Sequence, residues 1–258
     1  GSFDLVTPAI NCWNKQGHGE IEIREAIEQS CNYYFNMVGF KLGQDENGEF
    51  SENRSLTVLQ KYASEIGLDK KTGIELTESS PQVSNAYAVP SYIGQGTNAY
   101  TTSQLARYAT TIATSGTVYD LTLLDRQTDS KGSVLKEYEP NVINTMDVSQ
   151  NVWDDIHDGM YRVVQTHKQF DGLGVQVAGK TGTAEVDGVY HPNHGMFIGY
   201  APATDPQYAI AVRIENGYSS GNACLAADDI FKYIFQLADE QTILTGVAAS
   251  DTSDTSND

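Results

Sequence analysis

Two short groups of polar residues have types and spacings that could carry out chemistry. The first lies in residues 175–186, where Lys180, Thr181, Gly182 and Thr183 follow a run of strand-forming residues. Glycine weakens a strand, so glycines beside a single lysine are better explained by the close approach of another backbone, as on an open strand where a ligand lies. The alternative is a surface hairpin with a solvated lysine, because short motifs often match by chance.

The second group is Ser30 and Asn32, within a helical pattern that covers residues 23–42. Residues two positions apart do not share a face of a regular helix. They can converge on a cleft when a turn between two helices carries them, and the pattern allows a break near Ser30. The alternative roles are structural, with Ser30 as a helix cap and Asn32 as a residue that holds a turn.

Other polar groups are weaker candidates for a site. His191 and His194 have an HxxH spacing, but they lie in a predicted loop and have no third ligand. Cys12, Cys31 and Cys224 are odd in number and widely spaced, so they imply neither a disulfide framework nor a CxxC metal site. The sequence therefore predicts no metal and no other cofactor.

The composition is that of a globular protein with an acidic surface. Of its 258 residues 40% are hydrophobic, which is enough for a substantial core in one large or two small domains. The 16 basic residues against 34 acidic ones give a formal charge of -18, which argues against a nucleic-acid partner, because phosphate binding needs clustered lysine and arginine. No apolar run approaches the roughly 20 residues that span a bilayer, so any membrane attachment is expected outside this chain.

The elements expected to carry Ser30 and Asn32 are helices. Apolar residues at helical spacing predict helices over residues 23–42, 55–66, 102–115 and 148–164, the second of them capped by Ser55. Two short strands, at residues 118–124 and 134–138, are expected to pair through a turn at residues 129–132.

The elements expected to carry Lys180 are strands. Residues 194–200 and Tyr208–Ile214 are β-rich runs that follow the Lys180 strand, so the three should form an antiparallel meander. A helix at residues 223–237 should cover it, and the Ser-, Thr- and Asp-rich tail at 248–258 should be disordered. Helices followed by a meander and a covering helix indicate an α+β fold.

Taken together, the motifs resemble the C-terminal part of the transpeptidase domain of penicillin-binding proteins, most closely the high-molecular-weight class B type. The resemblance covers nearly all residues from about 11 to 237, and both order and spacing agree. The matching segments are Cys12-Trp13, Gly17-His18-Gly19, Arg24-Glu25-Ala26-Ile27, Ser30-Cys31-Asn32, Gly67-Leu68, Thr72-Gly73-Ile74-Glu75-Leu76, Ile93-Gly94-Gln95-Gly96, Gln104-Leu105-Ala106-Arg107-Tyr108, Gly179-Lys180-Thr181-Gly182-Thr183-Ala184-Glu185 and Gly199-Tyr200-Ala201-Pro202.

The resemblance implies part of the fold that penicillin-binding proteins share with serine β-lactamases, an antiparallel sheet with covering helices. Residues 1–247 would form this partial domain, with a helical part at about 20–170 and the sheet and last helix at about 171–240. The implied function is a share in peptidoglycan D,D-transpeptidation, with the peptidoglycan stem peptide and β-lactam antibiotics as ligands.

The resemblance also assigns roles to the two polar groups. Ser30 would relay a proton toward the leaving nitrogen, Asn32 would hydrogen-bond the amide of the acyl donor, and Lys180 would raise the local positive potential. The strand residues after Lys180 would bind the ligand: the carboxylate by Thr181 and Thr183, the oxyanion in part by the Thr183 backbone N–H, and the substrate backbone against Gly182, which has no side chain.

The catalytic Ser-x-x-Lys motif of this family should precede Ser30 by several tens of residues, and it is absent from the chain. Ser133 and Lys136 form the one Ser-x-x-Lys present, but in a predicted hairpin, where residues three apart point to opposite faces. A second Lys-Thr-Gly, at residues 71–73, resembles a structural turn of the same family. We therefore expect the chain by itself to be catalytically inactive.

The incomplete domain also carries expectations about partners and location. The missing N-terminal half or a second chain should cover strand Tyr208–Ile214, because a bare apolar edge associates readily. The family resemblance implies the extracytoplasmic face of the bacterial membrane, with an N-terminal anchor absent here. The alternative function is a non-enzymatic peptidoglycan- or β-lactam-binding or sensor module that uses the same cleft. An unrelated serine hydrolase is a further alternative, and the family resemblance disfavours it.

Overall fold

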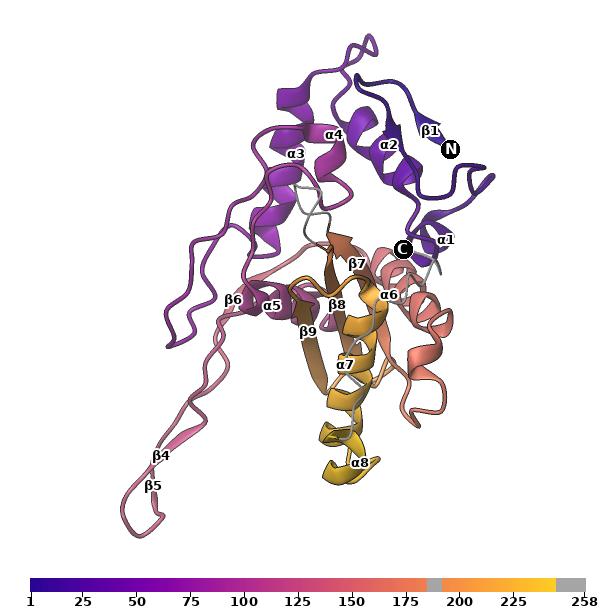
Figure 1. The fold of residues 1–258 in the computed structure, drawn as a ribbon. Coiled ribbons are helices and arrows are strands. Elements are labelled where there is room, and N and C mark those ends of the chain that lie inside the picture. The colour runs from indigo at the N-terminus through magenta and orange to yellow at the C-terminus, as the bar shows by residue number, and fades with distance from the viewer. Residues whose placement is uncertain (185–191, 245–258) are drawn as a thin grey trace.

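The computed structural model describes residues 1–184 and 192–244, and its architecture is α+β, as predicted (Figure 1). Its central sheet has three antiparallel strands in the order β7 (Ala178–Ala184), β8 (His194–Ala201) and β9 (Tyr208–Ile214). The register is regular, with Lys180 opposite Ile198 and Ile198 opposite Ala211. The predicted meander is therefore confirmed.

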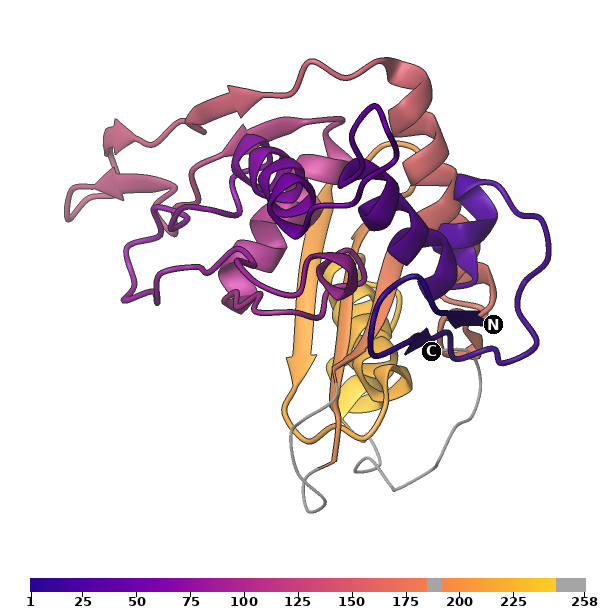
Figure 2. The same ribbon diagram turned by 90° about the horizontal axis from the view of Figure 1, so that it is seen from above.

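Helices pack against both faces of this sheet (Figures 1 and 2). Helix α7 (Ser220–Ile234) forms one core with Phe197 of β8, whereas α5 (Thr102–Ala113) and α6 (Gln150–Gln165) form another with Ala178 and Tyr200. Side chains alternate along a strand, so Phe197 and Tyr200, three residues apart, necessarily point into different cores. The sheet is thus held between the last long helix and the helices that precede Lys180.

The remaining elements are shorter and surround this framework. They are β1 (Ser2–Phe3), β2 (Ile10–Asn11), α1 (Ile23–Glu28), α2 (Asn32–Leu42), α3 (Glu52–Glu65), α4 (Ala88–Ser91), β3 (Thr117–Tyr119), β4 (Arg126–Thr128), β5 (Val134–Glu137), β6 (Val142–Thr145), the 3₁₀ helix η1 (Lys168–Phe170) and α8 (Glu240–Leu244). Within the described residues, no helix is both long and apolar enough to cross a membrane.

Three predicted elements differ from the structure. The strand that contains Val118 pairs with β6, not with residues 134–138, which pair instead with β4. The turn at residues 129–132 was predicted correctly, but β4 reads Arg-Gln-Thr and is fully exposed, so it has none of the apolar alternation that marks a strand.

Ser55 does not cap α3, which begins after Ser51. Instead Ser55 is buried and donates to the Gly39 carbonyl at 2.8 Å. The last helix begins at Ser220, three residues before the predicted start.

Candidate active site

Lys180 and Ser30 meet in the structure, although 150 positions separate them in the chain. Lys180 Nζ donates a hydrogen bond to Ser30 Oγ and another to the Thr181 carbonyl at 3.0 Å. An ammonium in contact with a hydroxyl polarises it and provides a path for a proton. The two polar groups singled out in the sequence therefore contribute to a single site.

Ser30 lies in the turn between α1 and α2, so the predicted break in the first helix is confirmed. The Ser30 amide donates to the Ile27 carbonyl at 3.2 Å and the Cys31 amide to the Ala26 carbonyl at 3.0 Å, which is the bond pattern of a Schellman motif. The motif gives Ser30 a φ of +48°, in the left-handed region that glycine usually occupies. A side chain in this conformation costs about 1 kcal/mol. Such strain often accompanies a functional role, and here the hydroxyl contacts Lys180.

Asn32 is the first residue of α2, and its side chain is oriented toward the N-terminal segment. Its Nδ2 donates to the Asn11 carbonyl at a long 3.5 Å. The N-cap position of α2 belongs to Cys31, so Ser30 is not the cap of that helix. Of the two motif residues, the described hydrogen bonds join Ser30 to Lys180 and Asn32 to the segment before the turn.

Strand β7 divides the predicted ligand-binding residues between its two faces. Ala178 packs with α6, so alternation puts Lys180 and Gly182 on that same face. Thr181 and Thr183 lie on the opposite face, where the Ser220 amide, at the start of α7, donates to Thr183 Oγ1 at 3.3 Å. The position of Ser220 was not anticipated from the sequence, because the polar residues that open α7 read as loop.

Gly182 differs from the other glycines of the sheet in having room around it. A Cβ on Gly182 would lie 3.7 Å from its nearest neighbour, Met196 Cβ, whereas one on Gly179 would lie 2.3 Å from the Phe197 ring. Packing inside this chain therefore explains glycine at position 179 but not at 182. Among the described strands β7 pairs with β8 alone, so its other edge can receive an extended peptide.

Both look-alike motifs lie away from this site. Ser133 and Lys136 are exposed residues of the β4–β5 hairpin, which projects from the body of the molecule (Figure 1). Residues 71–73 lie in the loop that follows α3, with Lys71 exposed and Thr72 buried. These positions agree with the sequence analysis, which treated both motifs as unrelated to the chemistry.

A cluster that could hold a metal ion lies next to the Ser30 turn. One ligand atom from each of Cys12, His18 and Cys31 lies within 4.8 Å of the others, and Cys12 Sγ is 3.8 Å from His18 Nδ1. Thiolates and imidazoles are ligands that Zn²⁺ accepts. The wide spacing of the cysteines in the sequence did not indicate this group, because the fold brings Cys31 and Cys12 together.

The histidine pair His191 and His194, considered in the sequence as a metal site, is described only in part. His194 Nδ1 accepts a hydrogen bond from the Asn216 amide at 3.1 Å, and residue 191 lies outside the described residues.

Comparison with known proteins adds independent information about this chain. Residues 3–236 match the family model of the penicillin binding protein transpeptidase domain. The chain is 28% identical to the peptidoglycan D,D-transpeptidase MrdA of Acinetobacter baumannii over 257 residues, which cover 86% of this chain and 35% of that relative. It thus spans about a third of the length of the curated relatives that it matches.

Solved structures have the same fold. Penicillin-binding protein 2B of Streptococcus pneumoniae matches with a TM-score of 0.76 at 25% identity, over 91% of this chain and 43% of that one. Penicillin-binding protein A of Mycobacterium tuberculosis, solved as a ceftriaxone acyl-enzyme complex, matches with a TM-score of 0.73 at 25% identity, over 90% and 53% of the two chains. The predicted partial transpeptidase fold is confirmed.

Proposed function

Because this chain belongs to the penicillin-binding protein transpeptidase family, we propose that it supplies part of the active site of a serine-type peptidoglycan D,D-transpeptidase. The observation that carries the proposal is the hydrogen bond from Lys180 to Ser30, which joins two of the three motifs expected of such a site. The third motif, Ser-x-x-Lys, would come from sequence that precedes this chain.

The proposed reaction is an acyl transfer. The serine oxygen of the missing motif attacks the carbonyl between the two D-alanines of a stem peptide, forming a C–O bond while the C–N bond to the terminal D-alanine breaks. The leaving nitrogen takes up a proton, and we assign its delivery to the Ser30 hydroxyl in contact with the Lys180 ammonium. An amine on the stem peptide of a neighbouring peptidoglycan strand then attacks the acyl carbonyl, releases the serine and completes the cross-link.

The ligand is proposed to lie along the free edge of β7. Its carboxylate would be held near Lys180 with the help of Thr181 and Thr183, and Asn32 would hydrogen-bond the amide of the acyl donor. The space over Gly182 supports this pose, because a backbone can approach there without displacing any side chain of the chain itself. For Thr181 and Thr183 the pose requires that their hydroxyls, on the α7 face, reach around the edge of the strand, and for Asn32 that its side chain turn away from Asn11.

The partner and the location follow from the partial domain. Strand β9 pairs with β8 alone among the described strands, so its other edge is proposed to bind the preceding half of the domain, or a second copy when that half is missing. The full-length protein would then act at the extracytoplasmic face of a bacterial membrane. Light scattering on the 258-residue chain should detect association, and a clean monomer whose β9 amides exchange rapidly would contradict the proposed pairing.

The proposal is tested by labelling with a fluorescent penicillin. The full-length protein should be labelled stoichiometrically. The 258-residue chain should remain unlabelled, because it lacks the serine of the catalytic Ser-x-x-Lys motif. The Ser133→Ala variant of the full-length protein serves as the matched control and should be labelled like the unmodified protein. An unlabelled full-length protein would contradict the transpeptidase assignment, and stoichiometric labelling of the isolated chain would show that the nucleophile lies within it.

A further inference from the structure

Helix α1, which leads into the turn at Ser30, is too short to be stable by itself. It has six residues, Ile23–Glu28, and only Ala26 is fully buried. Isolated helices shorter than about 12 residues are marginal in water. The position of the Ser30 hydroxyl must therefore depend on whatever holds α1 in place.

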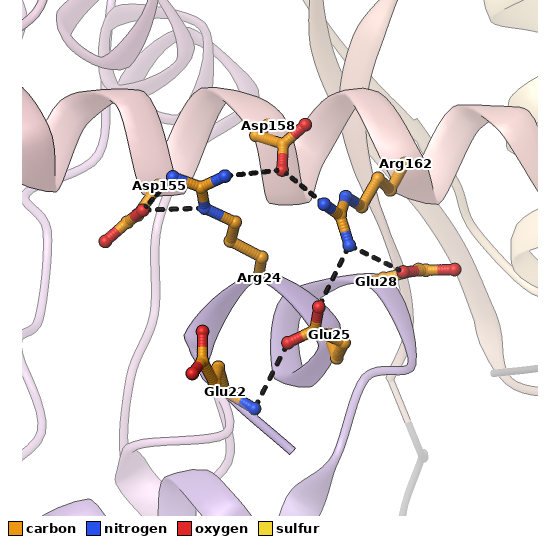
Figure 3. A network of polar contacts seen from close by, with 7 residues as sticks. All are labelled: Glu22, Arg24, Glu25, Glu28, Asp155, Asp158 and Arg162. Carbon is orange, nitrogen blue, oxygen red and sulfur yellow. Dashed lines mark hydrogen bonds and ion pairs between the residues drawn. The ribbon is translucent and has the colours of Figure 1, made fainter.

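Ionic contacts tie α1 to α6 in one continuous network (Figure 3). Arg24 of α1 contacts Asp155 at 2.6 Å and Asp158 at 3.4 Å, both on α6. Arg162 of α6 contacts Asp158 on its own helix at 2.8 Å and Glu25 of α1 at 3.0 Å. Each helix thus contributes one arginine, and Asp158 lies between the two guanidinium groups. A further contact at 3.9 Å joins Arg162 to Glu28, two residues before Ser30.

The packing beneath this network leaves little room between the helices. Ile27 of α1 lies against Gly159 of α6, where an added Cβ would come within 2.9 Å of the Ile27 Cβ. Helix α6 also packs against β7, because Met160 and Ala178 belong to one core cluster. One helix therefore supports both α1, which is followed directly by the turn at Ser30, and the strand that carries Lys180.

Because these side chains are partly exposed, loss of their ion pairs should affect the placement of α1 more than the stability of the whole fold. Each charged side chain of the network is between 27% and 41% exposed. Pairs this exposed add little to the stability of the fold, because water screens them and ordering long side chains costs entropy. Their loss should change the global stability little. It should, however, make the six-residue helix α1 more mobile, and with it the Ser30 hydroxyl that contacts Lys180.

We infer that Arg162, with Arg24, is a positioning residue that fixes the Ser30 hydroxyl against Lys180 by holding α1 on α6. Arg162 touches neither Lys180 nor Ser30 in the described contacts, and it acts through Glu25 and Glu28. The role in catalysis rests on the proposed transpeptidase function. The placement of α1 does not, so the two can be tested separately.

The first experiment uses the 258-residue chain and requires no activity. In Arg162→Met, backbone amides of residues 26–34 should exchange several-fold faster by hydrogen-exchange mass spectrometry, while the melting temperature shifts by only a few degrees. Arg126→Met is the matched control, because Arg126 pairs with Asp125 at 2.6 Å on the distant hairpin. That variant should leave exchange at residues 26–34 unchanged. Equal exchange in both variants would overturn the inference.

The second experiment measures penicillin acylation in the full-length protein, separating non-covalent affinity from the acylation rate constant. A displacement of about 1 Å can cost up to a hundredfold in rate, so Arg162→Met should lower the rate constant roughly tenfold and leave the affinity within about twofold. Arg162→Lys keeps the charge but lacks the fork that reaches Asp158 and Glu25 together, so it should recover only part of the rate. An acylation rate that is unchanged, or that falls only with the folded fraction, would refute the positioning role. If the unmodified protein is not acylated, the transpeptidase proposal fails, and the exchange experiment alone decides the placement of α1.

Discussion

The chain contains the tripeptide Lys-Thr-Gly twice, and the two copies have opposite surroundings. At residues 71–73 the lysine is exposed, the threonine is fully buried and the glycine has a φ of +87°. At residues 180–182 the lysine is half-buried and bonded to Ser30, and the glycine lies in a regular strand with space beside it. The same three residues thus belong to a loop in one place and to the edge of a candidate cleft in the other.

The first copy is held in place by hydrogen bonds with buried side chains. Glu78 accepts the Thr72 amide at 2.6 Å and the Thr72 hydroxyl at 3.2 Å. Arg107, which is only 1% exposed, donates to the Lys71 carbonyl at 3.0 Å. The Thr72 amide and the Lys71 carbonyl thus have partners inside the protein, whereas the free edge of β7 has no partner strand among the described residues. The second copy thus differs from the first in its open strand edge and in the hydroxyl that a distant turn supplies.

The largest difference between the two copies should appear on removal of the lysine. In the full-length protein, Lys180→Met should reduce penicillin acylation by roughly a hundredfold, since removing one group that stabilises developing charge typically costs that much. Lys71→Met should leave the acylation rate unchanged. Stopped-flow labelling of both variants measures the contrast, and equal rates would break the distinction between the two tripeptides.

The second contrast concerns stability and its dependence on pH. Burial would raise the pKa of the Glu78 carboxyl, but hydrogen bonds from Ser103, Thr72 and Thr101 outweigh burial and lower the pKa below its ordinary value. The ionised carboxylate therefore stabilises the fold above the unfolded pKa, and this contribution is lost as the pH falls through the lower folded pKa. Glu78→Gln should destabilise the chain by about 2 kcal/mol at pH 7, since hydrogen bonds to a buried charge are worth about that much.

Urea unfolding at several pH values tests this expectation. The stability gap between Glu78→Gln and the unmodified chain should begin to narrow as the pH drops below the ordinary glutamate pKa of about 4.3. It should close as the pH falls through the lower folded pKa, because the unmodified carboxyl is then uncharged, like the glutamine. A gap that is independent of pH would mean that shape, not charge, anchors the first tripeptide.

Replacement by alanine should destabilise the chain at Gly73 but not at Gly182. At Gly73, the positive φ and the nearby Asp120 Cβ at 3.3 Å predict a loss of about 1 kcal/mol for Gly73→Ala. Gly182→Ala should leave stability unchanged or raise it by about 0.5 kcal/mol, since the conformation suits any residue and the nearest atom is 3.7 Å away. If a ligand lies over Gly182, the same variant should weaken penicillin binding several-fold. Thermal unfolding and labelling rates together separate the two glycines.

Local patterns in the sequence predicted the elements of the site better than the contacts between them. Spacing of apolar residues predicted the helix around Ser30 and the strand around Lys180, because each depends on burial within a short window. Their meeting could be expected only from the family resemblance, since nothing in either window refers to the other. The network between Arg24 and Arg162 was not predicted for the same reason. Its partners are more than 100 positions apart, and in the sequence they resemble ordinary solvated charges.

The last predicted effect concerns Ser30 itself and the strain in its turn. Ser30→Gly should remove the cost of a left-handed side chain and raise the free energy of unfolding by up to about 1 kcal/mol, although the bond to Lys180 is lost. Ser30→Ala loses the same bond and keeps the strain, so it should be less stable than Ser30→Gly by about 1 kcal/mol. In the full-length protein both variants should acylate slowly. If the two are equally stable, Ser30 is not strained, and its position in the turn needs no functional explanation. If glycine is the more stable and the less active of the two residues at position 30, then serine stands there for the contact with Lys180.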